Sequence, residues 1–183
     1  RRSNLTIDDN DFLQCKPRAI YYEPVRGTED DEDITIKNCL FDNNTGPSDG
    51  IAVKLSNLLT DKVELSYLQF CNHQTDKYIL EVEFTNEISN ISFNTLEFIN
   101  NANTDSDPDD EHSHGGAGIN IINALKLAFS YCKFVSNWAR TKGGAIRFKD
   151  IDLLFDHCTF ANNSIPSNNQ HGGATYFGGN KEV

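Results

Sequence analysis

The chain has 183 residues, 38% of them hydrophobic and 23% charged, and its 27 acidic and 16 basic residues give a net charge of −11. This length suits one domain with a real core, and the charge disfavours nucleic acid or an anionic membrane as the main partner, since phosphate-binding faces need clustered Lys and Arg. No uncharged apolar run reaches about 18 residues, so no membrane span is expected in this segment.

Six copies of one repeat follow one another along the chain, each anchored on a Phe. The anchors are Phe12, Phe41, Phe70, Phe98, Phe134 and Phe160, separated by 29, 29, 28, 36 and 26 residues. Mostly apolar residues stand seven, five and two positions before each anchor, as Leu153, Phe155 and Cys158 do before Phe160. A spacing of two is that of a strand, and the change of phase between the last two positions predicts a bend there. Asn38, Thr95 and His157 fall at this bend.

Two short motifs complete the repeat. An Asn follows the anchor by three residues in four units, which gives the pairs Phe41 and Asn44, Phe98 and Asn101, Phe134 and Asn137, and Phe160 and Asn163. A Gly-Gly-Ala sequence precedes three of the later strands, with the pairs Gly115 and Gly116, Gly143 and Gly144, and Gly172 and Gly173. Gly tolerates positive φ and close backbone approach, so these pairs predict sharp turns into a sheet.

Repetition of the same positions from unit to unit is typical of a stacked solenoid, in which each coil buries its apolar face against the next. The sequence therefore predicts an all-β fold, a right-handed parallel β-helix of about six coils; the hand follows from the general preference for right-handed crossovers. Residues 1–183 form one such domain. The chain lacks Met and has core residues close to both ends, so we expect it to be an excerpt of a longer solenoid.

The paired motifs resemble the GGAI and FxxN repeats of the chlamydial polymorphic membrane proteins and of similar surface proteins in some protists, including trichomonads. The pattern covers most of the chain, although CKPRAIYY, SDGIAV and DKYILEV stand where Gly-Gly would be in the first three units, and FCNH ends in His. The resemblance implies a β-helical surface domain that acts in adhesion without catalysis. It also implies that the motif residues take part in binding host cells.

A structural interpretation of the same motifs is available from the residues alone. Phe in a stacked column belongs to the core, and Asn at a turn commonly forms an amide ladder along a solenoid. On this interpretation adhesion uses the exposed strands and loops that the motifs position.

Five cysteines occur without any CxxC pair, so neither a zinc ribbon nor a redox motif is indicated. Cys39, Cys132 and Cys158 share one inward position with Leu68 and Leu96, where they are expected to be reduced and to act as small apolar residues. Cys15 and Cys71 lie off this column, and a disulfide between them stays open.

An acidic loop at 104–114 is the one candidate metal site. Its candidate ligands are Asp105, Asp107, Asp109, Asp110, Glu111, His112 and His114. Carboxylates suit Ca²⁺, but the spacing of an EF-hand is absent, so a solvated loop is the favoured interpretation and no metal or cofactor is assigned.

Parallel β-helices also include polysaccharide lyases and hydrolases, which need convergent carboxylates and a basic residue on adjacent coils. Asp150, Asp152 and Asp156 lie near Arg147 and Lys149, but within one unit only. We therefore assign no catalytic residue. A purely structural filament component is the third alternative.

Four Asn-x-Ser/Thr sequons, at Asn4, Asn43, Asn90 and Asn162, are candidate glycosylation sites, in about the number that the composition gives by chance. The sequence thus predicts an extracellular or cell-surface binding rod. Its expected partners are a protein or glycan on a cell surface, or further copies or a continuation of the solenoid.

Overall fold

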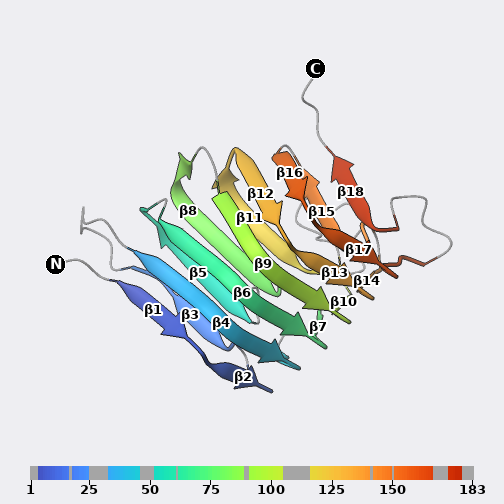
Figure 1. Ribbon diagram of the computed structural model, residues 1–183, viewed down its shortest axis with the longest axis horizontal. Coiled ribbons are helices and arrows are strands. Elements are labelled where there is room, and N and C mark those ends of the chain that lie inside the picture. Colours follow the sequence, from blue (N-terminus) through green and yellow to red (C-terminus); the bar gives the residue numbers. More distant parts are fainter. Residues whose placement is uncertain are drawn as a thin grey trace.

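A computed structural model of the protein describes residues 4–16, 18–24, 33–45, 52–60, 62–88, 91–104, 116–140, 142–149, 151–166 and 173–178. This part of the chain contains strands and no helix. The strands wind into a stack of coils in which each lies parallel to its counterpart in the next coil (Figure 1). The fold class is therefore all-β and a parallel β-helix, as the repeat predicts.

The largest sheet runs the length of the stack and has one strand, or a broken pair of strands, from each coil. Its main path is β1 (Leu5–Asp8), β4 (Ile34–Asp42), β6 (Val63–Cys71), β9 (Ile91–Ile99), β12 (Lys126–Ser130) and β16 (Asp152–Asp156). The shorter β2 (Asp11–Leu13), β13 (Lys133–Val135) and β17 (Thr159–Ala161) continue it past the bend. Six coils are therefore present, with five turns between the first and the last.

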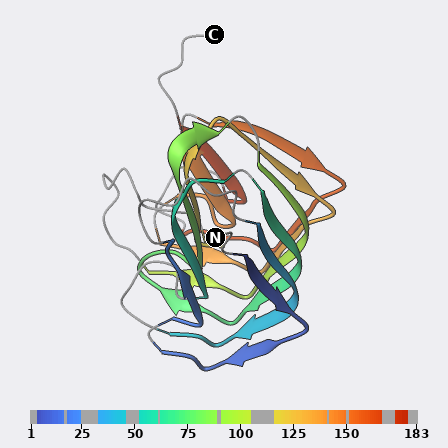
Figure 2. The ribbon, with the colours of Figure 1, turned by 90° about the vertical axis from the view of Figure 1, so that its left-hand side faces the viewer.

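The other sides of the coils form smaller sheets. One contains β3 (Ile20–Tyr22), β5 (Val53–Leu58), β8 (Leu80–Ile88) and β11 (Ile119–Ala124), and β15 (Ile146–Lys149) and β18 (Thr175–Gly178) pair in coils 5 and 6. A narrow sheet joins β7 (Gln74–Thr75), β10 (Ala102–Asn103) and β14 (Trp138–Ala139). Seen from the N-terminal end, the chain runs clockwise as it recedes, so the β-helix is right-handed (Figure 2).

The register between coils follows the sequence columns without a slip in the large sheet. Ile34 and Ile36 lie beside Val63 and Leu65, and Phe41 lies beside Phe70. The Phe rings stack face to face along the axis, with centroids 4.7–5.5 Å apart. The four middle rings of this column are fully buried. Burial of such large rings dominates core stability, so the anchor Phe is a core residue.

The bend in the large sheet has a backbone cause. The residue three positions before each anchor has a positive φ of 52–58° in every coil. We call this set the bend column; its members are Asp9, Asn38, Tyr67, Thr95, Tyr131 and His157. A left-handed residue turns the strand and restores an inward direction to the residue that follows. This confirms the bend predicted at Asn38, Thr95 and His157.

The Gly pairs are confirmed as sites of close approach where the structure describes them. A Cβ on Gly116 would lie 2.2 Å from the carbonyl oxygen of Gly144, and one on Gly144 would lie 2.1 Å from that of Gly173. Gly143 has a φ of +61°. Gly116 and Gly144 therefore pack directly on the backbone of the next coil, and the Ala that follows each of them, Ala117 and Ala145, is fully buried.

Candidate functional site

The Asn of each Phe-x-x-Asn motif points into the stack and forms an amide ladder. Its members are Asn44, His73, Asn101, Asn137 and Asn163, the first four with relative exposures of 0–1%. Asn137 shows the pattern: its Nδ2 donates to the carbonyl oxygen of Phe98 (2.9 Å), and its Oδ1 accepts from the backbone N–H of Asn101 (3.1 Å). Each Asn side chain of the ladder thus satisfies the backbone of the preceding coil. The motif residues are structural in this protein, and none of these buried amides can reach a partner molecule.

His73 replaces Asn in the third coil and keeps the ladder intact. Its Nδ1 lies 3.0 Å from Asn101 Oδ1, and its Nε2 lies 3.3 Å from Asn44 Nδ2. The Asn101 oxygen can only accept and the Asn44 nitrogen can only donate, so the ring must be neutral with its proton on Nδ1. Burial lowers the pKa of His73 from 6.5 to about 4, although its hydrogen bond to Asn101 works against this. His73 is therefore a member of the ladder whose hydrogen bonds depend on pH.

A second set of left-handed residues marks the corner two positions after each anchor, and we call it the corner column. It comprises Gln14, Asn43, Asn72, Asn100, Ser136 and Asn162, with φ of 51–57°. Asn is the usual non-glycine residue for this conformation. Exposed side chains here form an outer ladder: Asn100 Nδ2 donates to Asn72 Oδ1, and Asn72 Nδ2 donates to Asp42 Oδ1, each at 2.7 Å.

The bend column is exposed apart from the half-buried Thr95, and its third and fifth members are tyrosines. Tyr67 and Tyr131 are each 56% exposed, and the Tyr131 ring stacks on His157 with centroids 5.0 Å apart and planes at 19°. Thr95 lies between the two tyrosines in the sequence of coils. Aromatic rings on the outside of a β-helix are candidate contacts for a ligand.

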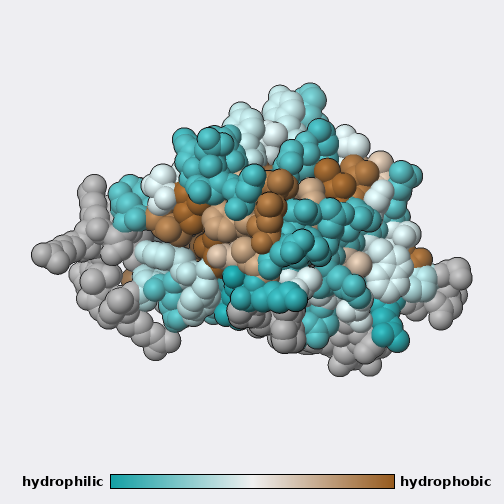
Figure 3. Space-filling view, turned by 90° about the horizontal axis from the view of Figure 1, so that it is seen from below, coloured by the Kyte–Doolittle hydropathy of each residue, from teal (hydrophilic) through white to brown (hydrophobic). Residues whose placement is uncertain are grey.

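An apolar stripe runs beside the Phe column on the outer face. The position after the anchor holds Leu13, Cys71, Ile99, Val135 and Ala161, with Asp42 in the second coil; Leu13 is 54% exposed and the others are half-buried. Figure 3 shows this underside, where apolar surface gathers along the middle between polar flanks. A stripe of this kind suits contact with another macromolecule.

In the sheet of β3, β5, β8 and β11, which we call the second sheet, Tyr21, Lys54, Glu81 and Asn120 share one column along the stack. Lys54 Nζ lies 2.9 Å from Glu81 Oε1, and the Arg147 guanidinium lies 5.8 Å from the centre of the Tyr176 ring. Lys54 and Glu81 therefore neutralise each other between adjacent coils, while Arg147 lies over an aromatic ring. Asp152 and Asp156, which lie near Arg147 in the sequence, are exposed on β16 of the large sheet, whereas Arg147 is on β15. Asp150 lies outside the described residues.

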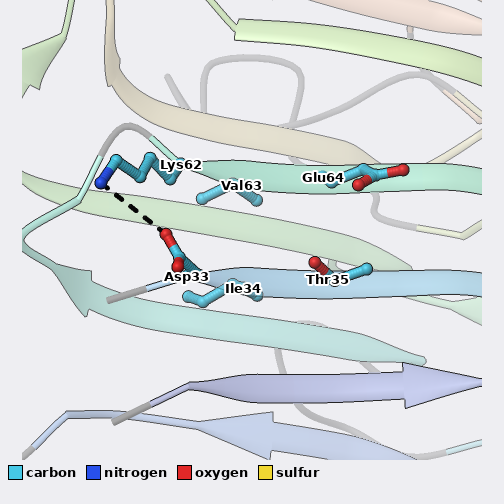
Figure 4. A pocket seen from close by; sticks show the side chains of 6 residues that line it. All are labelled: Asp33, Ile34, Thr35, Lys62, Val63 and Glu64. Carbon is cyan, nitrogen blue, oxygen red and sulfur yellow. Dashed lines mark ion pairs between the residues drawn. The ribbon is translucent and has the colours of Figure 1, made fainter. Parts of the chain in front are cut away.

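A shallow, open hollow of about 390 Å³ lies where β4 and β6 begin (Figure 4). Lys62 Nζ and Asp33 Oδ1 pair across it at 3.8 Å, and both side chains are about half exposed. Glu64 follows Lys62 by two residues, which places their Cα atoms about 7 Å apart. The Oε1 atom of Glu64 accepts a hydrogen bond from the Ser66 hydroxyl (3.0 Å). The register partner of Glu64 on β4 is Thr35, and the Asp33 carboxylate is paired with Lys62. This arrangement lacks the facing acid pair that glycoside hydrolysis needs.

The cysteines are all free thiols. Cys39 and Cys132 are buried in the inward column, as predicted, and Cys158 is partly buried there. Burial raises the pKa of Cys132 to about 12 and that of Cys71 to about 11. Such thiols are poor nucleophiles at neutral pH, so they act as packing groups.

Several predicted positions lie outside the described residues. These are the acidic loop ligands Asp105, Asp107, Asp109, Asp110, Glu111, His112 and His114, together with Gly115, Gly172 and Asn90. Within the described ranges, no three side chains of His, Cys, Asp or Glu lie close enough together to hold a metal ion. The same ranges contain no helix of the length and apolarity that a membrane crossing requires.

Three of the four sequons are described, and their Asn side chains are exposed. Asn43 and Asn162 occupy the corner column and Asn4 precedes β1. A glycan at either corner would point away from the stack.

The aromatic members of the bend column are not among the functional residues predicted from the sequence. The signal was present in the repeat itself: an outward position that holds Asn or Asp in the first two coils holds Tyr in the third and fifth.

Comparison with known proteins adds no relative, since the chain matches no protein-family model, no curated protein and no solved structure.

Proposed function

We propose that this protein is a non-catalytic binding rod of an extracellular or cell-surface protein and that it acts in adhesion. The observation that carries the proposal is that the repeated positions are buried in the core, whereas the positions that vary between coils face outward. The repeated residues, the Phe column and the amide ladder, are buried and bonded within the stack. The outward positions vary from coil to coil, and variable groups on a rigid scaffold are where recognition usually resides.

The outer faces supply the chemistry for such contacts. The corner column presents amide groups, the bend column presents aromatic rings, and an apolar stripe runs between polar flanks (Figure 3). The resemblance to the GGAI/FxxN surface proteins supports adhesion and a surface location. The exposed sequons at Asn43 and Asn162 are in keeping with a secreted glycoprotein.

The test is binding of the purified chain to intact cells and to immobilised matrix proteins, with a variant that lacks residues 105–113 as the comparison. We expect saturable binding by the intact chain, weakened in the variant while circular dichroism shows the same β-structure. The same preparations are incubated with acidic and neutral polysaccharides. Saturable binding without chain cleavage supports the proposal. Cleavage at enzyme-like rates that a single Asp substitution abolishes would establish a carbohydrate-active β-helix enzyme instead.

A further inference from the structure

Three consecutive members of the bend column keep residues that their backbone disfavours. Tyr67, Thr95 and Tyr131 have φ of 54°, 55° and 56°. A left-handed conformation costs an ordinary residue roughly 1–2 kcal/mol and costs Asn less. The corner column has the same conformation and uses Asn in four of its six coils. Backbone outliers of this kind concentrate at functional sites, so these three side chains point to a role outside the fold.

The register places the three side chains in adjacent coils. Ser66, Asn94 and Ser130 are register partners, and Tyr67, Thr95 and Tyr131 are the residues that follow them. The Tyr131 ring stacks on His157 along the axis, which covers one of its faces and leaves the other turned toward coil 4. In coil 4 the column holds the small Thr95, so the aromatic series is interrupted there.

The interruption has the thickness of one ring. Neighbouring coils lie about 4.8 Å apart, so Tyr67 and Tyr131 rise from positions about 10 Å apart. Stacked rings elsewhere in this protein have centroids 4.7–5.5 Å apart. A six-membered ring placed over Thr95 would therefore lie at stacking distance from both tyrosines.

The groups beside this gap are polar and hydrogen-bonding. Thr95 Oγ1 donates to Asn94 Oδ1 (3.0 Å), and the Asn94 side chain is exposed. On the other side, Glu97 accepts from Lys133 Nζ (2.6 Å) and from Gln69 Nε2 (3.4 Å). Aromatic faces bounded by amide and hydroxyl groups suit a sugar ring, whose C–H face is apolar and whose edge carries hydroxyls. An aromatic side chain of a protein partner could stack between the same rings, but it has no ring hydroxyls to hydrogen-bond with the exposed Asn94 amide.

We propose that Tyr67, Thr95 and Tyr131 form a clamp that holds one pyranose ring of a neutral glycan. The net charge of −11 disfavours acidic polysaccharides. The proposal rests on the binding function proposed above and names its ligand class. The proposal also predicts the stability of the variants. Because replacing either tyrosine with Asn relieves backbone strain, the variant that loses binding should be at least as stable as the parent protein.

The experiment titrates the whole chain with hexasaccharides of β-1,4-linked glucose, β-1,4-linked N-acetylglucosamine and α-linked mannose, using calorimetry and saturation-transfer NMR. Thr95→Tyr fills the gap and leaves both walls in place, while Tyr67→Asn and Tyr131→Asn remove one wall each. Tyr21→Asn, at a tyrosine 52% exposed on the second sheet, is the matched control. We expect at least one hexasaccharide to bind, with affinity reduced about tenfold or more in the first three variants and unchanged in the control.

The outcomes separate this proposal from the general one. The clamp is overturned if none of the three hexasaccharides binds, or if Thr95→Tyr leaves their binding unchanged. If the chain still binds cells or a matrix protein in that case, the rod function stands and its partner contacts another surface. If Thr95→Tyr abolishes binding to a purified protein but no hexasaccharide binds, the gap takes a side chain of a protein and the glycan assignment is wrong. Loss of thermal stability in both Tyr→Asn variants contradicts the strain argument.

Discussion

Replacing His73 with Asn should remove a large part of the protein's acid sensitivity. In the folded state the ring is neutral, and burial lowers its pKa to about 4, below the 6.5 of an exposed histidine. As the pH falls through 6.5, the unfolded chain takes up a proton that the folded chain refuses until about pH 4. The stability contributed by the neutral ring is therefore complete above pH 6.5 and is lost progressively between pH 6.5 and pH 4.

The two pKa values set the size of the effect. Their difference corresponds to about 3 kcal/mol once the pH is below both, and to about 2 kcal/mol between pH 7 and pH 5. Asn in place of His73 is the side chain that the neighbouring coils carry at this position, as Asn44 and Asn101, so the ladder should persist at pH 7. The variant should then lose about 2 kcal/mol less than the parent between pH 7 and pH 5, because carboxylate titration is common to both proteins.

The assay is urea unfolding at a series of pH values, followed by circular dichroism, for the parent, His73→Asn and the control His157→Asn at an exposed histidine. Nitrogen NMR of the folded parent should show the proton on Nδ1. Parallel pH profiles for the parent and His73→Asn would refute the reasoning, because they would mean that the ring is charged or solvated in the folded state.

Three further outcomes follow from the packing. Gly144→Ala should destabilise the protein by about 3 kcal/mol, because its Cβ would lie 2.1 Å from a backbone oxygen, whereas Gly173→Ala, with a nearest atom at 3.9 Å, should change the unfolding midpoint little. Cys132, with a pKa of about 12, should resist alkylation at neutral pH until urea unfolds the chain; fast labelling of the native protein would contradict its burial. Expression in a glycosylating host should attach glycans at Asn43 and Asn162, detected as mass shifts that an amidase removes, and failure at both would count against a secreted glycoprotein.

The fold was accessible from the sequence because each coil repeats the physical demands of the one before. Stacking forces the Phe at one position to lie on the Phe of the next coil, and a fault in one coil would propagate to its neighbours. Spacing alone therefore located the inward columns, the bend at Asn38 and the close approach at Gly144. The register in the large sheet confirms those columns.

The candidate site was less accessible because outward positions obey no such rule. Nothing in the spacing distinguishes Tyr131 from any other surface aromatic until its positive φ and its stacking on His157 are known. His73 shows the converse case. In the sequence it is a departure from the Asn motif, and only its two ring contacts show that it stays in the ladder, bonded to the Asn side chains of the coils before and after it.

The amide ladder gives the rod a direction. Each Asn side chain reaches back to the coil before it, where it accepts from one backbone N–H and donates to one carbonyl oxygen. A coil is therefore completed by its successor and does not complete itself. As coils are added toward the C-terminus, the free backbone groups at the corner of each coil are paired by the Asn side chain of the coil that follows. Peeling the last coil leaves the backbone N–H of Asn137 and the carbonyl oxygen of Phe134 unpaired, whereas peeling the first coil takes away the backbone partners of the Asn44 side-chain amide.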